Sequence, residues 1–358
     1  ETRERTALGL ELVDAAAAGN RLDRVVAIGS ALRTQTDLSP AQRLRLLKRL
    51  NGAIWQSRDT ARIAELEAEM VRFERLLPDE PSLAELWRQL AASYYKMGAQ
   101  DDALRVARLA LSKVRKHPGL VEYNANQIVF VVSAQQGRLP DAIAALLEVE
   151  RIGKALGKPA DPALLHNATG VFVYAHEWAK AIDYGQRALA AYDANPRKGL
   201  ARAEVLNNLG SAYEGADQLA RAEALYRQAL ASARAQDDAS LAGPLNNLAN
   251  VLRRQQRPRE ALPLLREAAA LIDAGTRGEH GDNGEAAIVH SNIGLALVDL
   301  GEREAAVGEF ERSRALFAQS DNVPRRLELY PRMIDNLDAL GRAREALALM
   351  REYNAVND

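Results

Sequence analysis

The amino-acid sequence predicts an all-α protein built as a solenoid of stacked helix-turn-helix units. Apolar residues at helical spacing precede each predicted turn, as in the stretch Trp87-x2-Leu90-Ala91-x2-Tyr94. A turn-forming residue follows in most units, at Gly98, Gly137, Asp217, Gly301 and Gly341. An alanine near the start of the second helix then recurs at intervals of 39, 39, 41, 39, 45 and 40 residues, at Ala103, Ala142, Ala181, Ala222, Ala261, Ala306 and Ala346. Because such a unit cannot bury its apolar stripe alone, neighbouring units are expected to stack.

The composition is typical of a folded globular chain and excludes several classes of function. Of 358 residues, 47% are hydrophobic and 27% are charged, and the net charge of −1 gives no field that would attract nucleic acid or a membrane surface. Cysteine is absent, which excludes disulfides, thiolate metal ligands and a cysteine nucleophile. No run of 18 apolar residues is present to span a bilayer. The start at Glu1 and the polar end "YNAVND" lead us to expect a mature form after signal removal or a piece of a longer gene product.

The units follow one another along the chain and divide it into two regions. Residues 1–80 hold two degenerate units, around "DAAAAGNRLDRVVAIGSAL" and "LKRLNGAIWQSRDTARIAELEAEM". Residues 81–358 are predicted to form one continuous regular array, in which the pattern is clearest in Trp87–Leu111, Leu206–Leu230, Leu245–Ala269, His290–Arg314 and Arg332–Tyr353.

Proline marks the boundaries between units, because it cannot continue a helix. It occurs in "LLPDEPS" (76–82), "RKHPG" (115–119), "GKPADP" (157–162), "NPRKG" (195–199) and "NVP" (322–324). The interval of 45 residues is explained by the Gly-rich insertion "GTRGEHGDNGE" (275–285), which is predicted to be a surface loop. Pro263 and Pro331 fall in or at the start of predicted helices and predict a local kink or a late helix start.

These units resemble the tetratricopeptide repeat (TPR), whose pattern is W-x2-L-G-x2-Y followed by A-x3-F. The stretch Leu206-x2-Leu209-Gly210-x2-Tyr213 is followed by Ala222-x3-Tyr226, and a later unit has Ala306-x3-Phe310. The period of about 39 to 45 residues is longer than the family's period of about 34. The resemblance implies a right-handed superhelix of about nine TPR-like repeats, or eighteen helices, whose task is binding.

Paired asparagines in the first helices are the candidate ligand-binding residues. "LNNLGSAY" begins at Leu206 and "LNNLANVL" at Leu245. The resemblance places these amides beside the apolar stripe, on the concave groove, where an amide suits the backbone of an extended peptide. Asn208, Asn247 and Asn292 match a slot in which the family often uses Asn, which favours a structural role there. The predicted groove residues are Asn207, Asn208, Asn246, Asn247, Asn250, Arg253, Asn292, His166, Asn167, Tyr95 and Lys96.

Other chemistry receives little support from the sequence. The five histidines are dispersed without a metal-ligand spacing, and no nucleophile elbow, Walker loop or dinucleotide fingerprint is present. Glu65, Glu67 and Glu69 are expected on a solvated helix face, whereas Trp87 and Tyr94 are expected in the core. We therefore predict a protein that is not an enzyme, has no cofactor or metal, and does not bind nucleic acid.

Two functional hypotheses remain. The C-terminal stretch "ALGRAREALALMREYNAVND" resembles the last repeat before the membrane segment in bacterial diguanylate cyclases and histidine kinases. That resemblance implies a periplasmic sensory module that binds a peptide or protein and is tied to the membrane only through segments beyond this chain. The alternative is a constitutive scaffold for protein assembly, either cytoplasmic or periplasmic. Homodimer formation is left open in both.

Overall fold

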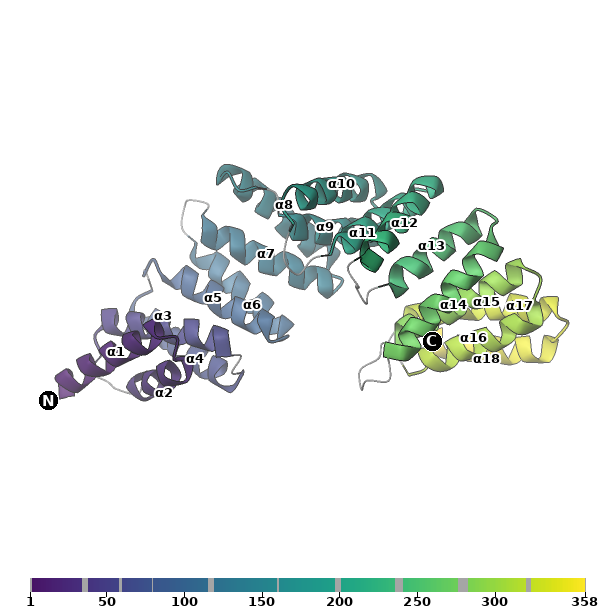
Figure 1. Ribbon diagram of the computed structural model, residues 1–358. Helices are drawn as coiled ribbons and strands as arrows, with labels where there is room; N and C mark the ends of the chain where they lie inside the picture. Colours follow the sequence, from purple (N-terminus) through teal and green to yellow (C-terminus); the bar gives the residue numbers. More distant parts are fainter. Residues whose placement is uncertain are drawn as a thin grey trace. The chain divides into compact units, whose positions relative to one another are not determined.

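The computed structural model of the chain describes residues 2–33, 38–57, 60–78, 80–114, 119–159, 161–196, 201–235, 241–275, 283–319 and 323–357. Within these ranges the regular structure is eighteen α-helices and no strand, which confirms the all-α prediction (Figure 1). None of the helices described is both long and apolar enough to cross a membrane. The helices are α1 (Thr2–Ala18), α2 (Leu22–Arg33), α3 (Pro40–Ser57), α4 (Thr60–Leu76), α5 (Leu83–Lys96), α6 (Gln100–Lys113), α7 (Leu120–Gln135), α8 (Leu139–Ala155), α9 (Pro162–Tyr174), α10 (Trp178–Ala194), α11 (Arg202–Gly215), α12 (Leu219–Ala235), α13 (Ala242–Arg254), α14 (Pro258–Gly275), α15 (Asn283–Asp299), α16 (Arg303–Phe317), α17 (Val323–Ala339) and α18 (Ala343–Asn357).

The chain forms two compact units, Glu1–Ala160 and Asp161–Asp358, which we call unit 1 and unit 2. Unit 1 contains the helix pairs from α1 to α8, and unit 2 contains those from α9 to α18. In both units an odd-numbered first helix packs against the even-numbered second helix that follows it, and each pair packs against the next. The predicted division into residues 1–80 and 81–358 stays a prediction.

The turns between paired helices use a left-handed residue to reverse the chain. All five predicted turn residues have a positive φ, between +57° at Asp217 and +81° at Gly301. Glycine adopts this conformation without the steric cost that a Cβ atom brings. The same conformation occurs in three further turns, at Asn20, His176 and Gln256. The glycine pattern in the sequence did not reveal these turns, because other residues occupy the position.

Small residues bring the two helices of each repeat into close contact. The seven recurring alanines of the second helices are all buried, with at most 4% of their surface exposed. Opposite them, a Cβ atom at Gly210 would lie 2.7 Å from the ring of Tyr226, and one at Gly294 would lie 2.6 Å from the ring of Phe310. Tyr226 and Phe310 are at most 1% exposed. The glycine in the repeat pattern is therefore required by packing, since only glycine leaves room for the aromatic ring of the second helix.

The two helical prolines do not delay the start of their helices. Pro263 lies inside α14, which begins at Pro258, and Pro331 lies inside α17, which begins at Val323. The alternative of a late helix start is therefore wrong, and the alternative of a local kink stays a prediction. Most of the predicted loop at 275–285 lies outside the described residues; α14 ends at Gly275 and α15 begins at Asn283.

Unit 1 corrects the expectation of a solvated face for two of the three acidic side chains of α4, whereas Glu65 is exposed as expected. Glu69 is 5% exposed and forms ion pairs with Arg43 and Arg72. Glu67 accepts hydrogen bonds from the hydroxyl of Tyr94, at 2.6 Å, and from Arg105. Burial alone would raise the pKa of Glu67, but these hydrogen bonds outweigh it and lower the pKa. Acidic residues at every second position did not distinguish a free surface of the helix from one covered by the next helix.

Two glycines of the same repeat test the packing argument. We expect Gly294→Ala to lower the free energy of unfolding by about 1–3 kcal/mol, because the new methyl group overlaps Phe310. Gly308, on α16, has no atom within 4 Å of its Cβ position. Gly308→Ala should raise stability by about 0.5–1 kcal/mol, since alanine favours the helix. Thermal unfolding followed by circular dichroism compares the two variants with the wild type. Equal effects of the two substitutions would contradict the assignment.

Candidate functional site

The paired asparagines form hydrogen bonds between successive repeats of unit 2. Asn247 on α13 donates from Nδ2 to Oδ1 of Asn207 on α11, at 3.1 Å. One repeat later, Asn292 on α15 donates in the same way to Asn246, at 2.8 Å. The second polar residue of each pair therefore reaches back to the first residue of the preceding pair.

The same pattern extends to α9. Nδ2 of Asn208 lies 3.4 Å from the ring nitrogens of His166. Burial lowers the pKa of His166, which favours the neutral imidazole that can accept this hydrogen bond. Asn246 also donates to Asn247, at 3.4 Å, and so joins two of the inter-repeat contacts. We call the whole set the amide ladder; its members are His166, Asn207, Asn208, Asn246, Asn247 and Asn292.

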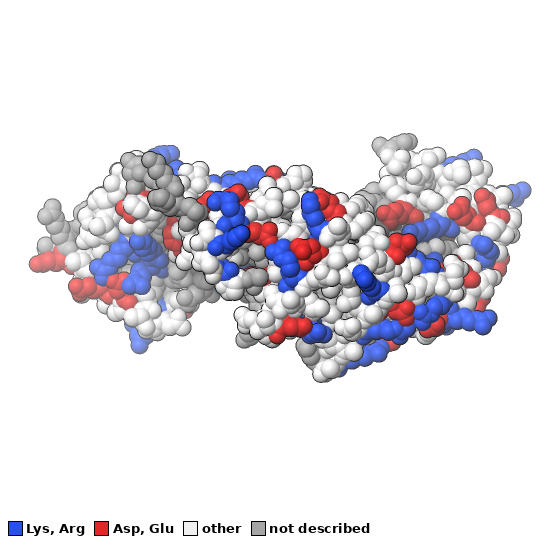
Figure 2. Space-filling view, turned by 90° about the horizontal axis from the view of Figure 1, so that it is seen from above, with Lys and Arg blue, Asp and Glu red and all other residues white. Residues whose placement is uncertain are grey.

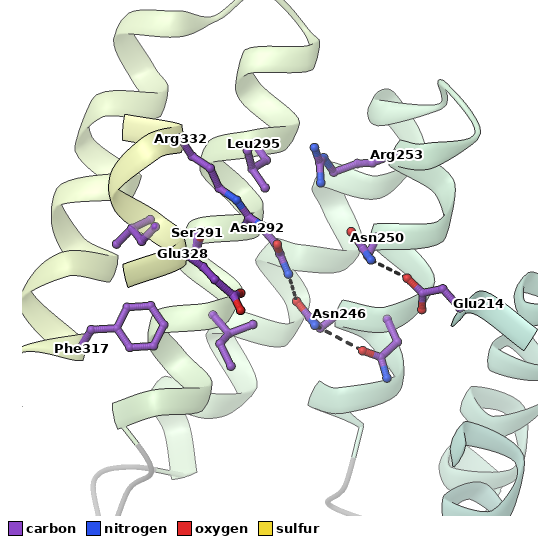
Figure 3. Close-up of a pocket in the computed structure, with 13 residues that line it drawn as sticks. Glu214, Asn246, Asn250, Arg253, Ser291, Asn292, Leu295, Phe317, Glu328 and Arg332 are labelled. Atoms are coloured by element: carbon purple, nitrogen blue, oxygen red, sulfur yellow. Dashed lines mark hydrogen bonds between the residues drawn. The ribbon is translucent and has the colours of Figure 1, made fainter. Parts of the chain in front are cut away.

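A hollow of about 600 Å³ opens beside the ladder on the first-helix side of unit 2. Side chains from α11, α13, α15 and α17 line it, together with the last residue of α16, so it crosses four successive repeats (Figure 3). Its lining combines amides, both signs of charge and apolar side chains. The lining residues are Glu214, Asn246, Asn247, Asn250, Arg253, Ile288, Ser291, Asn292, Leu295, Phe317, Glu328, Leu329 and Arg332.

Glu214 connects the hollow to the core of unit 2. Its Oε1 atom accepts a hydrogen bond from Nδ2 of Asn250 at 2.6 Å, and its Oε2 atom accepts one from the hydroxyl of Tyr226 at 2.9 Å. Burial, followed by the charge of Glu214, raises the pKa of Tyr226 well above its usual value, so the hydroxyl keeps its proton. Because Nδ2 of Asn250 is directed to Glu214, Oδ1 of Asn250 is the end of this amide that can accept from a ligand.

Charged side chains stand on both sides of the hollow. Arg253 on α13 donates from Nε to Oδ2 of Asp299 on α15, at 2.8 Å, and its side chain is only 13% exposed. Glu328 and Arg332 lie one turn apart on α17, across the hollow from Asn250 (Figure 3). The hollow therefore has charges of both signs on each side, Arg253 and Glu214 on one and Glu328 and Arg332 on the other.

The predicted groove residues fall into three groups. Asn246, Asn247, Asn250, Arg253 and Asn292 line the hollow. Asn207, Asn208 and His166 belong to the ladder without lining the hollow. The remaining predicted residues are not among the lining residues: exposed Asn167 on α9, and Tyr95 and Lys96 on α5 of unit 1. Trp87, on the same helix as Tyr95, is fully buried, as expected for a core residue.

Several lining residues were not predicted from the sequence, although the repeat spacing indicates three of them. Arg332 follows Asn292 by 40 residues, which is the interval between Ala306 and Ala346, so it occupies the same slot of the next repeat. Glu214 precedes Arg253 by 39 residues, the interval between Ala222 and Ala261. Glu214 and Arg332 carry charge at these equivalent positions, so the pattern of asparagines did not indicate them. Ser291 follows Asn246 by 45 residues, the interval between Ala261 and Ala306, and so occupies the slot of Asn246. No sequence pattern pointed to Phe317 or Glu328.

Positive and negative charges are finely mixed on the face of the molecule that Figure 2 draws. Figure 2 shows Lys and Arg side chains interspersed with Asp and Glu over the face that it draws. Among the described residues, many exposed charges form ion pairs three or four residues apart on one helix, such as Arg151 with Glu148 and Arg227 with Glu223. Such exposed pairs contribute little to stability, and they neutralise the surface locally.

Comparison with known proteins agrees with the repeat pattern. Residues 202–235 and 240–319 each match a family model described as tetratricopeptide repeat. The helix pairs and these matches show that the chain is a TPR-like helical solenoid. A comparison with curated proteins gives no match.

Three similar solved structures share this fold at low sequence identity. The apo form of RapI is 14% identical, with 98% of this chain and 97% of RapI covered and a TM-score of 0.63. The apo quorum sensor NprR from B. thuringiensis is 13% identical over 89% of this chain and 97% of NprR, with a TM-score of 0.59. A Rap protein complexed with Competence and Sporulation Factor is 15% identical over 89% of this chain and 97% of its own, with a TM-score of 0.52.

The described histidines make local contacts rather than a metal centre. Within the described ranges no three His, Asp or Glu side chains are grouped as metal ligands would be. His176 occupies a left-handed turn, and His290 is 4% exposed with its Nδ1 atom 2.7 Å from Oε2 of Glu309. His117 and His280 lie outside the described residues. The hydrogen bond with His290 lowers the pKa of Glu309.

This contact predicts a specific dependence of stability on pH. Because the pKa of Glu309 is lower in the folded protein than its ordinary value of 4.5, its carboxylate stabilises the fold above that pH. The contribution is lost as the pH falls below 4.5 and through the folded pKa. We expect the wild type to melt above Glu309→Gln at neutral pH and the difference to shrink towards low pH. Melting temperatures of both proteins across a pH series give this difference. A difference that does not change with pH would contradict the prediction.

Proposed function

We propose that unit 2 binds an extended peptide segment, free or part of a protein, in the hollow beside the amide ladder. The observation that carries this proposal is a single 600 Å³ hollow that crosses four repeats and is lined by amides. A peptide backbone presents hydrogen-bond donors and acceptors in alternation, and a side-chain amide can form hydrogen bonds with both.

The arrangement of the lining explains how a peptide would be oriented. Oδ1 of Asn250 faces a ligand because its Nδ2 atom is held by Glu214. Arg253 is fixed by Asp299, so its charge stands at the hollow without the entropy of a free long side chain. Ile288, Leu295 and Phe317 supply apolar contact beside these polar groups. Amides thus hold the backbone, while the charged and apolar residues select its side chains.

We further propose that this binding serves as the input of a bacterial signalling protein on the periplasmic side of the membrane. Two features support a sensory role: the resemblance of the C-terminal stretch to the last repeat of membrane-bound sensors, and the fold shared with the quorum sensor NprR. The absence of cysteine is compatible with the periplasm. In a solenoid each repeat contacts mainly its neighbours, so small rotations add along the array. A ligand that contacts four successive repeats can therefore change the pitch of unit 2. A constitutive scaffold would bind without that change.

Selection from a random peptide display library on the whole chain provides the test of binding. Affinity for the selected peptides is then measured by calorimetry for the wild type and for the Asn246→Ala/Asn250→Ala variant. We expect the variant to bind at least about tenfold more weakly, because it removes the amides that hold the backbone. Asn124→Ala is the matched control, since Asn124 is a half-buried asparagine on a first helix of unit 1. Melting temperatures show that all variants remain folded.

The outcomes separate the proposals. Equal affinity of the wild type and the double variant would overturn the assignment of the hollow. Failure to select any peptide would contradict peptide binding altogether. Small-angle scattering with and without saturating selected peptide then distinguishes the roles, because an unchanged profile favours the scaffold over the sensor.

A further inference from the structure

Two amides that line the hollow present their oxygen atoms to a ligand. Nδ2 of Asn250 donates to Glu214, and Nδ2 of Asn292 donates to Asn246 (Figure 3). Within the described residues, no hydrogen bond reaches Oδ1 of Asn250 or Oδ1 of Asn292. A group that binds beside these two amides therefore meets hydrogen-bond acceptors and has to supply the donors.

Glu214 adds a negative charge to the same set of acceptors. Its side chain is 15% exposed, and its carboxylate accepts hydrogen bonds from two neutral groups, the amide of Asn250 and the hydroxyl of Tyr226. Arg254 lies 3.5 Å from Oε1 of Glu214, but it makes a shorter contact, of 2.7 Å, with Asp217. Among the described residues, Glu214 and Asp217 thus share one arginine, which cannot compensate both negative charges.

The other charged residues of the lining do not compensate Glu214 either. Arg253 is held by Asp299 at 2.8 Å, so this pair is neutral as a whole. Glu328 and Arg332 carry opposite charges one turn apart on α17 and leave the balance of charge unchanged. The end of the hollow at Glu214 therefore combines a negative charge with hydrogen-bond acceptors.

We infer that the peptide in the hollow carries a basic side chain, lysine or arginine, that binds Glu214; this inference rests on the function proposed above. A lysine ammonium and an arginine guanidinium each have several N–H donors and no acceptor. Such a group can donate to the carboxylate of Glu214 and to Oδ1 of Asn250 together, in charge-assisted hydrogen bonds. A backbone N–H of the same peptide then donates to Oδ1 of Asn292 in the next repeat.

Acidic and apolar side chains fit the same place less well. A carboxylate would lie beside Glu214, which has the same charge, and it would compete with Asp299 for Arg253. An apolar side chain would remove water from the carboxylate of Glu214 without supplying a hydrogen bond in its place. Glu214 therefore selects a basic residue both by attraction and by exclusion of the alternatives.

A pair of peptide libraries tests this inference on the whole chain. Both display random octapeptides with a blocked N-terminus, so that a terminal ammonium cannot replace a basic side chain. One library contains all amino acids, and the other omits lysine and arginine. We expect peptides selected from the complete library to share a basic residue at one aligned position. They should bind at least about tenfold more tightly than the best peptides of the other library.

The outcomes distinguish this inference from the function on which it rests. Equal affinity of the best peptides from the two libraries would overturn the inference and leave peptide binding intact. An acidic residue at the shared position would also overturn it. If neither library gives a peptide that binds, peptide binding and the inference are both overturned.

A double-mutant cycle then tests the contact with Glu214. Calorimetry compares the selected peptide with a variant in which glutamine replaces the basic residue, on the wild type and on Glu214→Gln. We expect each single change to weaken binding at least about tenfold and the second change to add little, because the charge pair is already lost. Glu204→Gln is the matched control, since Glu204 is an exposed acid of the same helix that does not line the hollow.

Melting temperatures show whether both protein variants remain folded. The change in the peptide is measured on the wild type, so it tests the need for a basic residue even if Glu214→Gln does not fold. Full loss on each change, independent of the other, would overturn the contact between the basic residue and Glu214. So would an unchanged affinity of Glu214→Gln for the selected peptide.

Discussion

The structure depends on one constraint, namely that a pair of helices cannot bury its apolar surface by itself. Glycine at positions 210 and 294 brings the two helices of a repeat together over Tyr226 and Phe310, but the outer sides of the pair remain apolar. Stacking buries those sides and places equivalent residues of successive repeats next to one another. The ladder and the hollow both follow from this stacking.

Most of the fold could be predicted from the sequence because the packing constraint is local and repeats. The buried alanines recur at intervals of 39 to 45 residues, mostly with a turn residue before them, so each repeat supports the assignment of the next. The sequence pattern failed to predict turns in which a residue other than glycine adopts the left-handed conformation, and helices that contain a proline. His176 and Gln256 take the left-handed turn conformation without being glycine, and α14 and α17 continue through their prolines. Those outcomes depend on packing around the segment, which one repeat's sequence does not contain.

The candidate site was predictable only in part, for a related reason. The sequence placed Asn207 and Asn246 on one face at repeat spacing, and the structure puts both in the ladder. Which amide bonds to a neighbour and which faces a cavity depends on the contact between repeats. Asn250 shows this, because its orientation is set by Glu214, a residue of the preceding repeat. Pairs of this kind become visible in a sequence only when equivalent positions are compared whatever their residue type.

The ladder also gives a physical reason why a ligand in the hollow would change the contacts between stacked repeats. Asn246 lines the hollow, donates to Asn247 and accepts from Asn292, so its amide already serves the contact between two repeats. A ligand that hydrogen-bonds to Asn246 or Asn292 competes with that contact or polarises it. Since the same atoms hold the repeats in register and line the hollow, ligand affinity and the geometry of the stack are linked. A site built from side chains outside the ladder would bind without that linkage.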